Sequence, residues 1–179
     1  MQIFYTGPED VYTQLDATHQ ALFSSHRFKS GVGTLEFISG VSTIPNMCFK
    51  NVNMTTIIIP EGIVSLGWES FSNTTLVEMD LPSTLSSTGL FALSETYTLK
   101  NITCRAVTPP IINGRLAPPM KSWHTLYVPA ESVEAYKASE WNGYFVFVQP
   151  IEAPCTHSGK GFNTCQMLDT DYVIQERIK

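Results

Sequence analysis

The clearest indication of the fold is the stretch Met54-Thr55-Thr56-Ile57-Ile58-Ile59-Pro60-Glu61-Gly62-Ile63-Val64-Ser65-Leu66-Gly67-Trp68-Glu69-Ser70-Phe71. The apolar residues of this stretch recur in the same order in the stretches before and after it, 22 or 23 residues away. A repeat of this length is typical of folds in which each repeat forms one coil of a stack. The middle of the chain is therefore expected to be a repeat array.

The repeat defines columns of apolar residues that we expect to form the core. They are Val32, Met54, Leu76 and Leu99; Leu35, Ile57, Met79 and Ile102; Phe37, Ile59, Leu81 and Cys104; Val41, Ile63 and Leu85; Ile44 and Leu66; and Phe49, Phe71 and Leu93. The residue before the last column is small each time, as Cys48, Ser70 and Ala92, so we interpret Cys48 as a spacer and not as a nucleophile. Gly67 and Gly89 share one position of the repeat, where we expect glycine to supply a positive φ at a tight corner.

Each repeat is expected to contribute one short strand that ends at a proline, as at Pro60 and Pro82. Because strand side chains alternate, Ile57 and Ile59 face one side and Ile58 faces the other. A single coil cannot bury its apolar face alone, so successive coils stack into a parallel sheet with a continuous core.

The quoted stretch resembles the BspA-like leucine-rich repeats found in surface proteins of gut Bacteroidetes, treponemes and some protists. That repeat reads roughly L-x-x-I-x-I-P-x-x-V-x-x-I-G-x-x-A-F, and residues 54–71 follow it, as do residues 76–93 with Leu93 in place of Phe. The resemblance continues into residues 102–110 and 126–141, which look like the closing segment of Bacteroidetes members. It implies a mainly β leucine-rich-repeat β-solenoid with 22–23-residue coils, used for recognition without catalysis.

We expect four segments in the chain. Residues 1–31 form an N-terminal β cap with a strand at Ile3-Phe4-Tyr5, and residues 32–110 form the solenoid. Residues 111–151 form a C-terminal cap, in which a strand around Leu126 and Val128 precedes a short helix, and residues 152–179 form a C-terminal arm. Such caps are needed because an open end of a stack exposes apolar side chains and unpaired strand edges.

The composition argues against binding to nucleic acid or to a membrane surface and against a membrane-spanning segment. The net charge is −5 and only 15 % of the residues are charged, so attraction to nucleic acid or to an anionic membrane surface is not expected. The longest apolar run is far shorter than a membrane-spanning helix requires, and the first residues lack the basic and apolar regions of an export signal.

The outward-facing strand residues are the candidate binding face, defined as Glu36, Ile58, Glu78, Asp80, Thr103 and Tyr127. We expect two columns on this face, one with Glu36, Ile58, Asp80, Thr103 and Tyr127, and the other with Thr34, Thr56, Glu78 and Asn101. Apolar side chains beside carboxylates suit the recognition of a protein or glycan. An ordinary solvated face is the alternative interpretation.

Outside this face, the sequence contains few residues in a pattern typical of a catalytic or metal-binding site. The four histidines are scattered and no known catalytic motif is present, so we expect no enzyme activity, no catalytic residues, no cofactor and no metal. Cys155, His157 and Cys165 are residue types that bind zinc, but a fourth ligand is missing, which favours free thiols.

The apolar residues Leu168, Tyr172, Ile174 and Ile178 lie among charges near the end of the chain and form a candidate assembly arm, held by a partner chain or a second copy. We therefore expect a subunit of a larger assembly, best interpreted as a decoration or fibre protein of a phage virion. A secreted or cell-surface adhesin that binds a host protein or glycan is the alternative.

Overall fold

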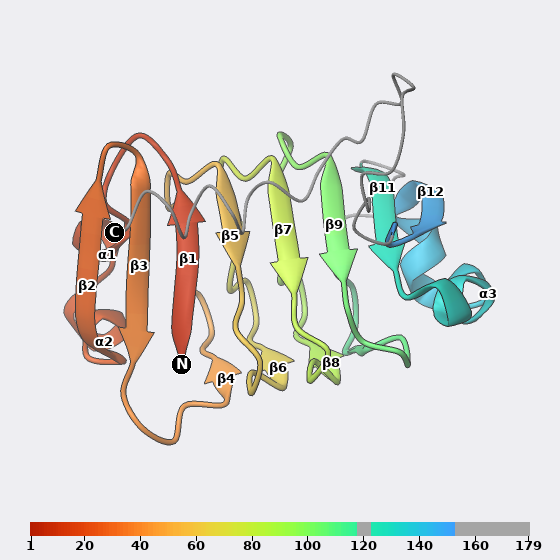
Figure 1. The fold of residues 1–179 in the computed structure, drawn as a ribbon, viewed down its shortest axis with the longest axis horizontal. Helices are drawn as coiled ribbons and strands as arrows, with labels where there is room; N and C mark the ends of the chain where they lie inside the picture. Colours follow the sequence, from red (N-terminus) through yellow and green to blue (C-terminus); the bar gives the residue numbers. More distant parts are fainter. Residues whose placement is uncertain (118–122, 153–179) are drawn as a thin grey trace, which may run out of the picture.

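The protein is described here by a computed structural model, which covers residues 1–117 and 123–152. Within these ranges the fold is mainly β and has two sheets (Figure 1). The larger sheet has, in spatial order, β12 (Phe145–Pro150), β11 (Trp123–Val128), β9 (Asn101–Cys104), β7 (Glu78–Leu81), β5 (Thr56–Ile58), β1 (Gln2–Thr6), β3 (Val32–Phe37) and β2 (Phe23–Lys29). The smaller sheet has β10 (Ile111–Ile112), β8 (Ser87–Thr88), β6 (Ser65–Leu66) and β4 (Thr43–Ile44).

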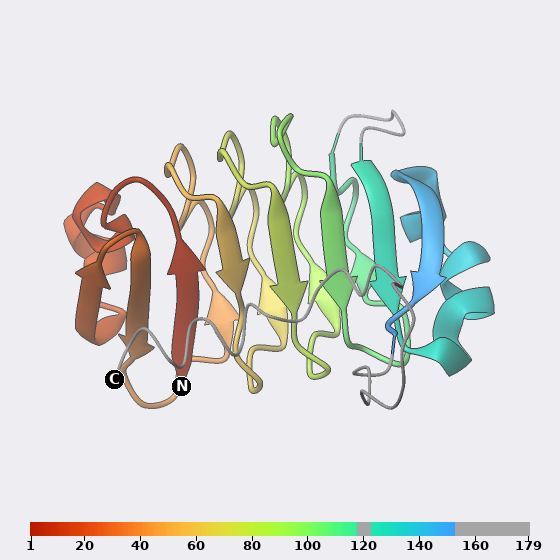
Figure 2. The ribbon, with the colours of Figure 1, turned by 45° about the horizontal axis from the view of Figure 1, so that its top comes forward.

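The strands of the repeat pair at the spacing that the sequence predicts. In the larger sheet Ile57 lies beside Met79, Met79 beside Ile102, and Ile102 beside Leu126, all in parallel strands. The smaller sheet was not predicted, and its strands pair in parallel at the same spacing, as Ile44 does with Leu66. Figure 2 shows each coil passing from the larger sheet to the smaller one and back. The coils therefore stack in register along one axis.

Most residues of the predicted core columns are buried between the two sheets, whereas Val32 and Val41 are only partly buried. Met54, Leu76, Ile102 and Leu126 are completely inaccessible to solvent, and the rings of Phe49 and Phe71 stack with centroids 5.1 Å apart. Cys48, Ser70 and Ala92 are also buried, which confirms that this position of the repeat requires a small residue. The sequence thus predicted most of the core correctly, because a stack of coils buries the same position in successive repeats.

The role expected for two glycines is wrong. Neither Gly67 nor Gly89 has a positive φ. A Cβ at Gly67 would instead lie 2.5 Å from the backbone nitrogen of Asn46, and one at Gly89 would lie 2.6 Å from that of Trp68. Glycine is needed here because the backbone of the preceding coil passes too close for any side chain.

The left-handed backbone occurs at other positions of the repeat. Glycine holds one of them, as Gly40 and Gly62 with φ values of 85° and 96°, but two further positions hold other residues. One position holds Met47, Glu69 and Phe91, with φ values of 59°, 49° and 57°. The other holds Asn51, Asn73 and Glu95, with φ values of 64°, 54° and 60°. The turns of each coil therefore impose this conformation by their geometry, whatever the residue.

The first strand corrects the predicted arrangement of the N-terminal cap. Residues 3–5 do form a strand, but β1 lies inside the sheet, between β5 and β3, and is antiparallel to both. The end of the sheet is instead β2, which pairs antiparallel with β3. Two short helices, α1 (Val11–Gln14) and α2 (Ala17–Gln20), connect β1 to β2, and each begins at an aspartate whose side chain accepts a hydrogen bond from the first turn.

The opposite end agrees with the expected strand and helix and adds one strand. β11 joins β9 in parallel and is followed by a 3₁₀ turn (Ala130–Ser132), by α3 (Val133–Lys137) and by a second 3₁₀ turn (Glu140–Gly143). Trp141 and Phe145 are buried, and the Trp141 indole donates a hydrogen bond of 2.8 Å to the carbonyl oxygen of Pro110. The unpredicted β12 then pairs in parallel with β11 and ends the sheet.

Candidate binding face

The outer face of the larger sheet is the side opposite the core, and four predicted residues form one continuous row on it. Ile58 pairs with Asp80, Asp80 pairs with Thr103, and Thr103 pairs with Tyr127. All four side chains are partly exposed. The structure thus brings together the central part of the predicted face.

The two remaining predicted residues lie away from this row. Glu78 belongs to the second row, between Thr56 and Asn101, and its Oε1 accepts a long hydrogen bond of 3.4 Å from the Asn101 amide. Glu36 is not adjacent to the row of Ile58, because β1 separates their strands. Glu36 pairs instead with Gln2 and with Ser25, whose hydroxyl donates to its Oε2 at 3.0 Å.

The insertion of β1 also changes the composition of the face. Phe4 occupies the place predicted for Glu36 beside Ile58 and is partly exposed. The next residue in this row is Thr34, which is 5 % exposed, so the expectation that Thr34 faces solvent is wrong. The row therefore contains two adjacent apolar side chains, Phe4 and Ile58, which the sequence alone did not place together.

Asp80 is neutralised by a residue that sequence reasoning missed. The guanidinium of Arg105 donates two hydrogen bonds to the Asp80 carboxylate, at 2.9 Å from Nε and 2.5 Å from a terminal nitrogen. This bidentate geometry fixes both side chains. Arg105 follows β9 by one residue, so its position in the repeat gave no signal that it reaches across to β7. The face is accordingly more apolar and less acidic than the sequence predicted.

The two buried cysteines are unsuited to nucleophilic chemistry. Burial raises the pKa of the Cys48 thiol to about 12, and the nearby Asp16 carboxylate adds to this effect. Burial also raises the pKa of Cys104 to about 11, although the Tyr136 hydroxyl donates to its sulfur at 3.2 Å. Thiols with such pKa values are protonated at neutral pH and act as small apolar groups.

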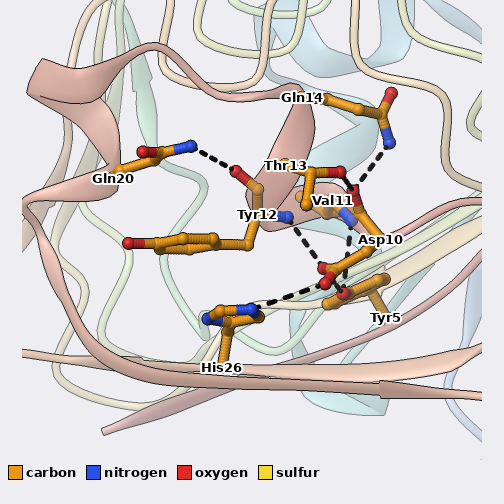
Figure 3. A network of polar contacts seen from close by, with 8 residues as sticks. All are labelled: Tyr5, Asp10, Val11, Tyr12, Thr13, Gln14, Gln20 and His26. Carbon is orange, nitrogen blue, oxygen red and sulfur yellow. Dashed lines mark hydrogen bonds and ion pairs between the residues drawn. The ribbon is translucent and has the colours of Figure 1, made fainter.

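A separate polar cluster lies at the N-terminal end of the sheet (Figure 3). Asp10 Oδ1 accepts hydrogen bonds from the Tyr5 hydroxyl at 2.7 Å and from the Tyr12 amide at 3.0 Å. His26 lies on β2 with Nε2 3.6 Å from Asp10 Oδ2, and its ring stacks on Tyr12 with centroids 3.9 Å apart. Burial and the bond to Asp10 raise the pKa of Tyr5, so this hydroxyl stays protonated and continues to donate.

This cluster holds α1 against the sheet, since its contacts connect residues of β1, α1 and β2. In residues 1–117 and 123–152, no group of three or more His, Cys, Asp or Glu side chains is arranged to hold a metal ion. The Asp10–His26 pair is one of the contacts that pack α1 against the sheet.

Two sequence predictions fall on residues that the structure does not describe. They are the assembly arm of Leu168, Tyr172, Ile174 and Ile178, and the thiols and imidazole of Cys155, Cys165 and His157. Among the described helices, none is long and apolar enough to cross a membrane.

Comparison with known proteins gives one match. The family described as "BspA type Leucine rich repeat region" matches residues 22–112, with six copies of the repeat. No curated protein and no solved structure matches the chain. The matched residues contain β2 to β10, whereas β1, β11 and β12 lie outside them.

Proposed function

The chain belongs to the BspA-type leucine-rich repeat family, and on this basis we propose that it is a recognition module that binds a protein through the outer face of its larger sheet. Repeats of this family are generally non-enzymatic and serve protein interaction or adhesion. A cell surface or extracellular location, with a host protein or glycan as the ligand, fits such a role. We infer further that residues 32–110, into whose sheet β1 inserts, act as a short β-solenoid. It is closed by β2 with α1 and α2 at one end and by residues 111–151 at the other.

The observation that carries this proposal is the row of Phe4, Ile58, Asp80, Thr103 and Tyr127. It combines two adjacent apolar side chains, an aromatic ring with a hydroxyl group, and a carboxylate held rigidly by Arg105. Interfaces commonly have a small apolar centre with polar groups around it. The backbone of paired strands also loses little conformational entropy on binding, because the sheet already orders it.

The other hypothesis is a subunit of a virion, encoded by a phage of gut Bacteroidetes. It depends on the arm, and residues 153–179 lie outside the described part of the chain, so no described residue favours it. Light scattering on the full chain and on a chain truncated after Ile151 tests the arm directly. Loss of an oligomer on truncation would support assembly through Leu168, Tyr172, Ile174 and Ile178.

The recognition proposal is tested with three variants on arrays of cell-surface proteins and of glycans. Ile58→Asp and Tyr127→Ala alter the face, whereas Val107→Asp places a charge at a residue that is 57 % exposed on the loop after β9. We expect array ligands to bind the unaltered chain and the Val107→Asp control, and to bind both face variants at least tenfold more weakly. Equal binding by all four proteins, or no ligand on either array, would contradict the proposal.

A further inference from the structure

The larger sheet ends in two strands whose outer edges have different chemistry. β2 and β12 lie at opposite ends of the sheet (Figure 1), and within residues 1–117 and 123–152 no further strand pairs with either of them. An unpaired edge presents backbone N–H and C=O groups to any strand that approaches. The described part of the molecule therefore has two open sheet edges.

The β2 edge is polar and basic. Ser24, Ser25, His26, Arg27 and Lys29 are all exposed on this strand. Of these, Arg27 and Lys29 carry full positive charges, and no ion pair connects either of them to an acidic side chain of the described residues. Basic side chains on an edge disfavour pairing with a second basic edge, because like charges would be brought together.

The β12 edge is apolar and lies beside acidic groups. Val146 and Phe147 are 46 % and 47 % exposed, and β12 contains no charged residue. The 3₁₀ turns and α3 that contact β12 carry Glu131, Glu134 and Glu140, against which only Lys137 is positive. Lys137 is already paired with Glu134 at 2.9 Å, so the two 3₁₀ turns and α3 together carry an excess of negative charge.

The strand directions of the two edges are compatible. β12 runs parallel to β11, β9, β7 and β5. From β5 the direction reverses at β1, again at β3 and again at β2, because these three pairings are antiparallel. β2 is therefore antiparallel to β12. A second copy in the same orientation, placed next along the stack, presents its β2 to β12 in the antiparallel sense that sheets commonly use.

We propose that β12 of one copy of this chain pairs with β2 of the next, so that the larger sheet continues from copy to copy. Three edge pairings are conceivable, and charge selects among them. A β2–β2 contact brings Arg27 and Lys29 against the same residues of the other copy, and a β12–β12 contact brings glutamates together. Only the β12–β2 contact joins opposite charges, which favours this combination and disfavours the other two.

This contact is heterologous, since it joins two different surfaces. Every assembly still ends in one free β2 edge and one free β12 edge, so association is open-ended and gives chains of copies whose length depends on concentration. Salt shortens these chains, because the attraction between Arg27, Lys29 and the glutamates is screened. The proposal concerns self-association and does not depend on what the outer face recognises.

The test uses two full-length variants that each disable one edge. Variant A carries Val146→Lys and Phe147→Lys on β12, and variant B carries Arg27→Glu and Lys29→Glu on β2. All four positions are exposed, so both variants are expected to keep the fold, which circular dichroism and the melting temperature check. Each variant has a matched control with the same kind of change at exposed residues that lie on neither β2 nor β12. The control for variant A carries Tyr97→Lys and Val107→Lys, and the control for variant B carries Lys100→Glu and Arg115→Glu.

The measurement is the average mass by sedimentation and light scattering as concentration rises at low salt. The unaltered chain and both controls should rise from the monomer mass of 19.9 kDa to at least twice that value. Variants A and B should each remain monomeric alone, but associate when mixed, because the mixture restores an intact β12 and an intact β2. In the mixture, the new lysines on β12 of variant A and the new glutamates on β2 of variant B are also opposite in charge. This attraction favours association of the two variants as well.

Three results would overturn the proposal. If variant B alone still dimerises, the contact is β12–β12, and if variant A alone still dimerises, it is β2–β2. If the unaltered chain stays monomeric up to millimolar concentration, the two edges do not pair at all.

Discussion

Gly89 lies directly against the backbone of Trp68 in the preceding coil, where a Cβ would be 2.6 Å from the Trp68 nitrogen and 2.7 Å from the carbonyl carbon of Gly67. Its own amide donates a hydrogen bond of 2.7 Å across the same gap to the Leu66 carbonyl oxygen. The separation of the coils, and not a left-handed turn, explains why glycine occupies this position.

Gly89→Ala should therefore destabilise the fold. Even one methyl group forces the coils apart, and overpacking of this kind costs about 1–3 kcal/mol of unfolding free energy. Urea unfolding followed by fluorescence measures the loss. The comparison is Gly40→Ala, where φ is 85° and nothing lies within 4 Å of the added Cβ, so that variant reports backbone strain alone. Unchanged stability of Gly89→Ala would contradict the close approach.

Glu95 occupies the left-handed position that Asn51 and Asn73 hold in earlier coils, with φ of 60°. Asparagine adopts this conformation at lower cost than other non-glycine residues. The Asn73 amide also donates to Asn51 Oδ1 at 2.9 Å. We expect Glu95→Asn to raise the unfolding free energy by about 0.5–1 kcal/mol and Glu95→Val to lower it by about 1–2 kcal/mol.

Thermal unfolding of both Glu95 variants provides the check. Glu9→Asn is the control, because Glu9 is exposed and does not have a positive φ. A gain of the same size in the control would mean that the loss of a carboxylate, and not backbone conformation, caused the effect.

Cys48 and Cys104 should resist alkylation in the native protein. Their pKa values of about 12 and about 11 leave very little thiolate at pH 8, and both side chains are buried. Labelling by iodoacetamide should be at least roughly a hundredfold slower than in urea, where an ordinary thiol pKa applies. Mass spectrometry of the peptides around each residue follows the two sites separately. Rapid native labelling of Cys104 would show that the C-terminal end of the core is open.

Glu61 links two coils and should contribute a pH-dependent part of stability. Partial burial alone would raise its pKa, but hydrogen bonds from the amide and hydroxyl of Ser83, at 2.9 Å each, and from Thr84 hold the pKa below its ordinary value of 4.5. A carboxylate with a lowered folded pKa stabilises the fold above its unfolded pKa. This stabilisation is lost as the pH falls through the folded value.

Glu61→Gln should therefore be less stable than the unaltered chain at pH 7, by less than about 1 kcal/mol because Glu61 is largely exposed. The difference should shrink as the pH falls from 5 to 3. Urea midpoints at several pH values measure it, and taking the difference between the two proteins cancels the titration of other carboxylates. A difference that is constant across this range would contradict the role assigned to the carboxylate.

Part of the binding face was predictable and part was not. Ile58, Asp80, Thr103 and Tyr127 follow from alternation within strands and the repeat between them, so their row agrees with the pairing observed. Phe4 was not predictable as their neighbour, because an alternating pattern identifies a strand without identifying its partners. The contact of Arg105 with Asp80 was missed for a similar reason. Arg105 lies just after its strand, and its long side chain reaches a residue of the adjacent coil.

Periodicity along the chain was enough to predict the repeat, its 22-residue register, most of the buried columns and the need for a small residue beside each phenylalanine position. These properties recur in every coil, so the sequence contains several copies of the same pattern that can be compared with one another. Only the tertiary structure decided where β1 inserts, that β12 extends the sheet, and that Gly67 and Gly89 are required by contact between coils. The physical reason is that such features depend on the distance and direction between segments far apart in the chain, which local periodicity does not encode.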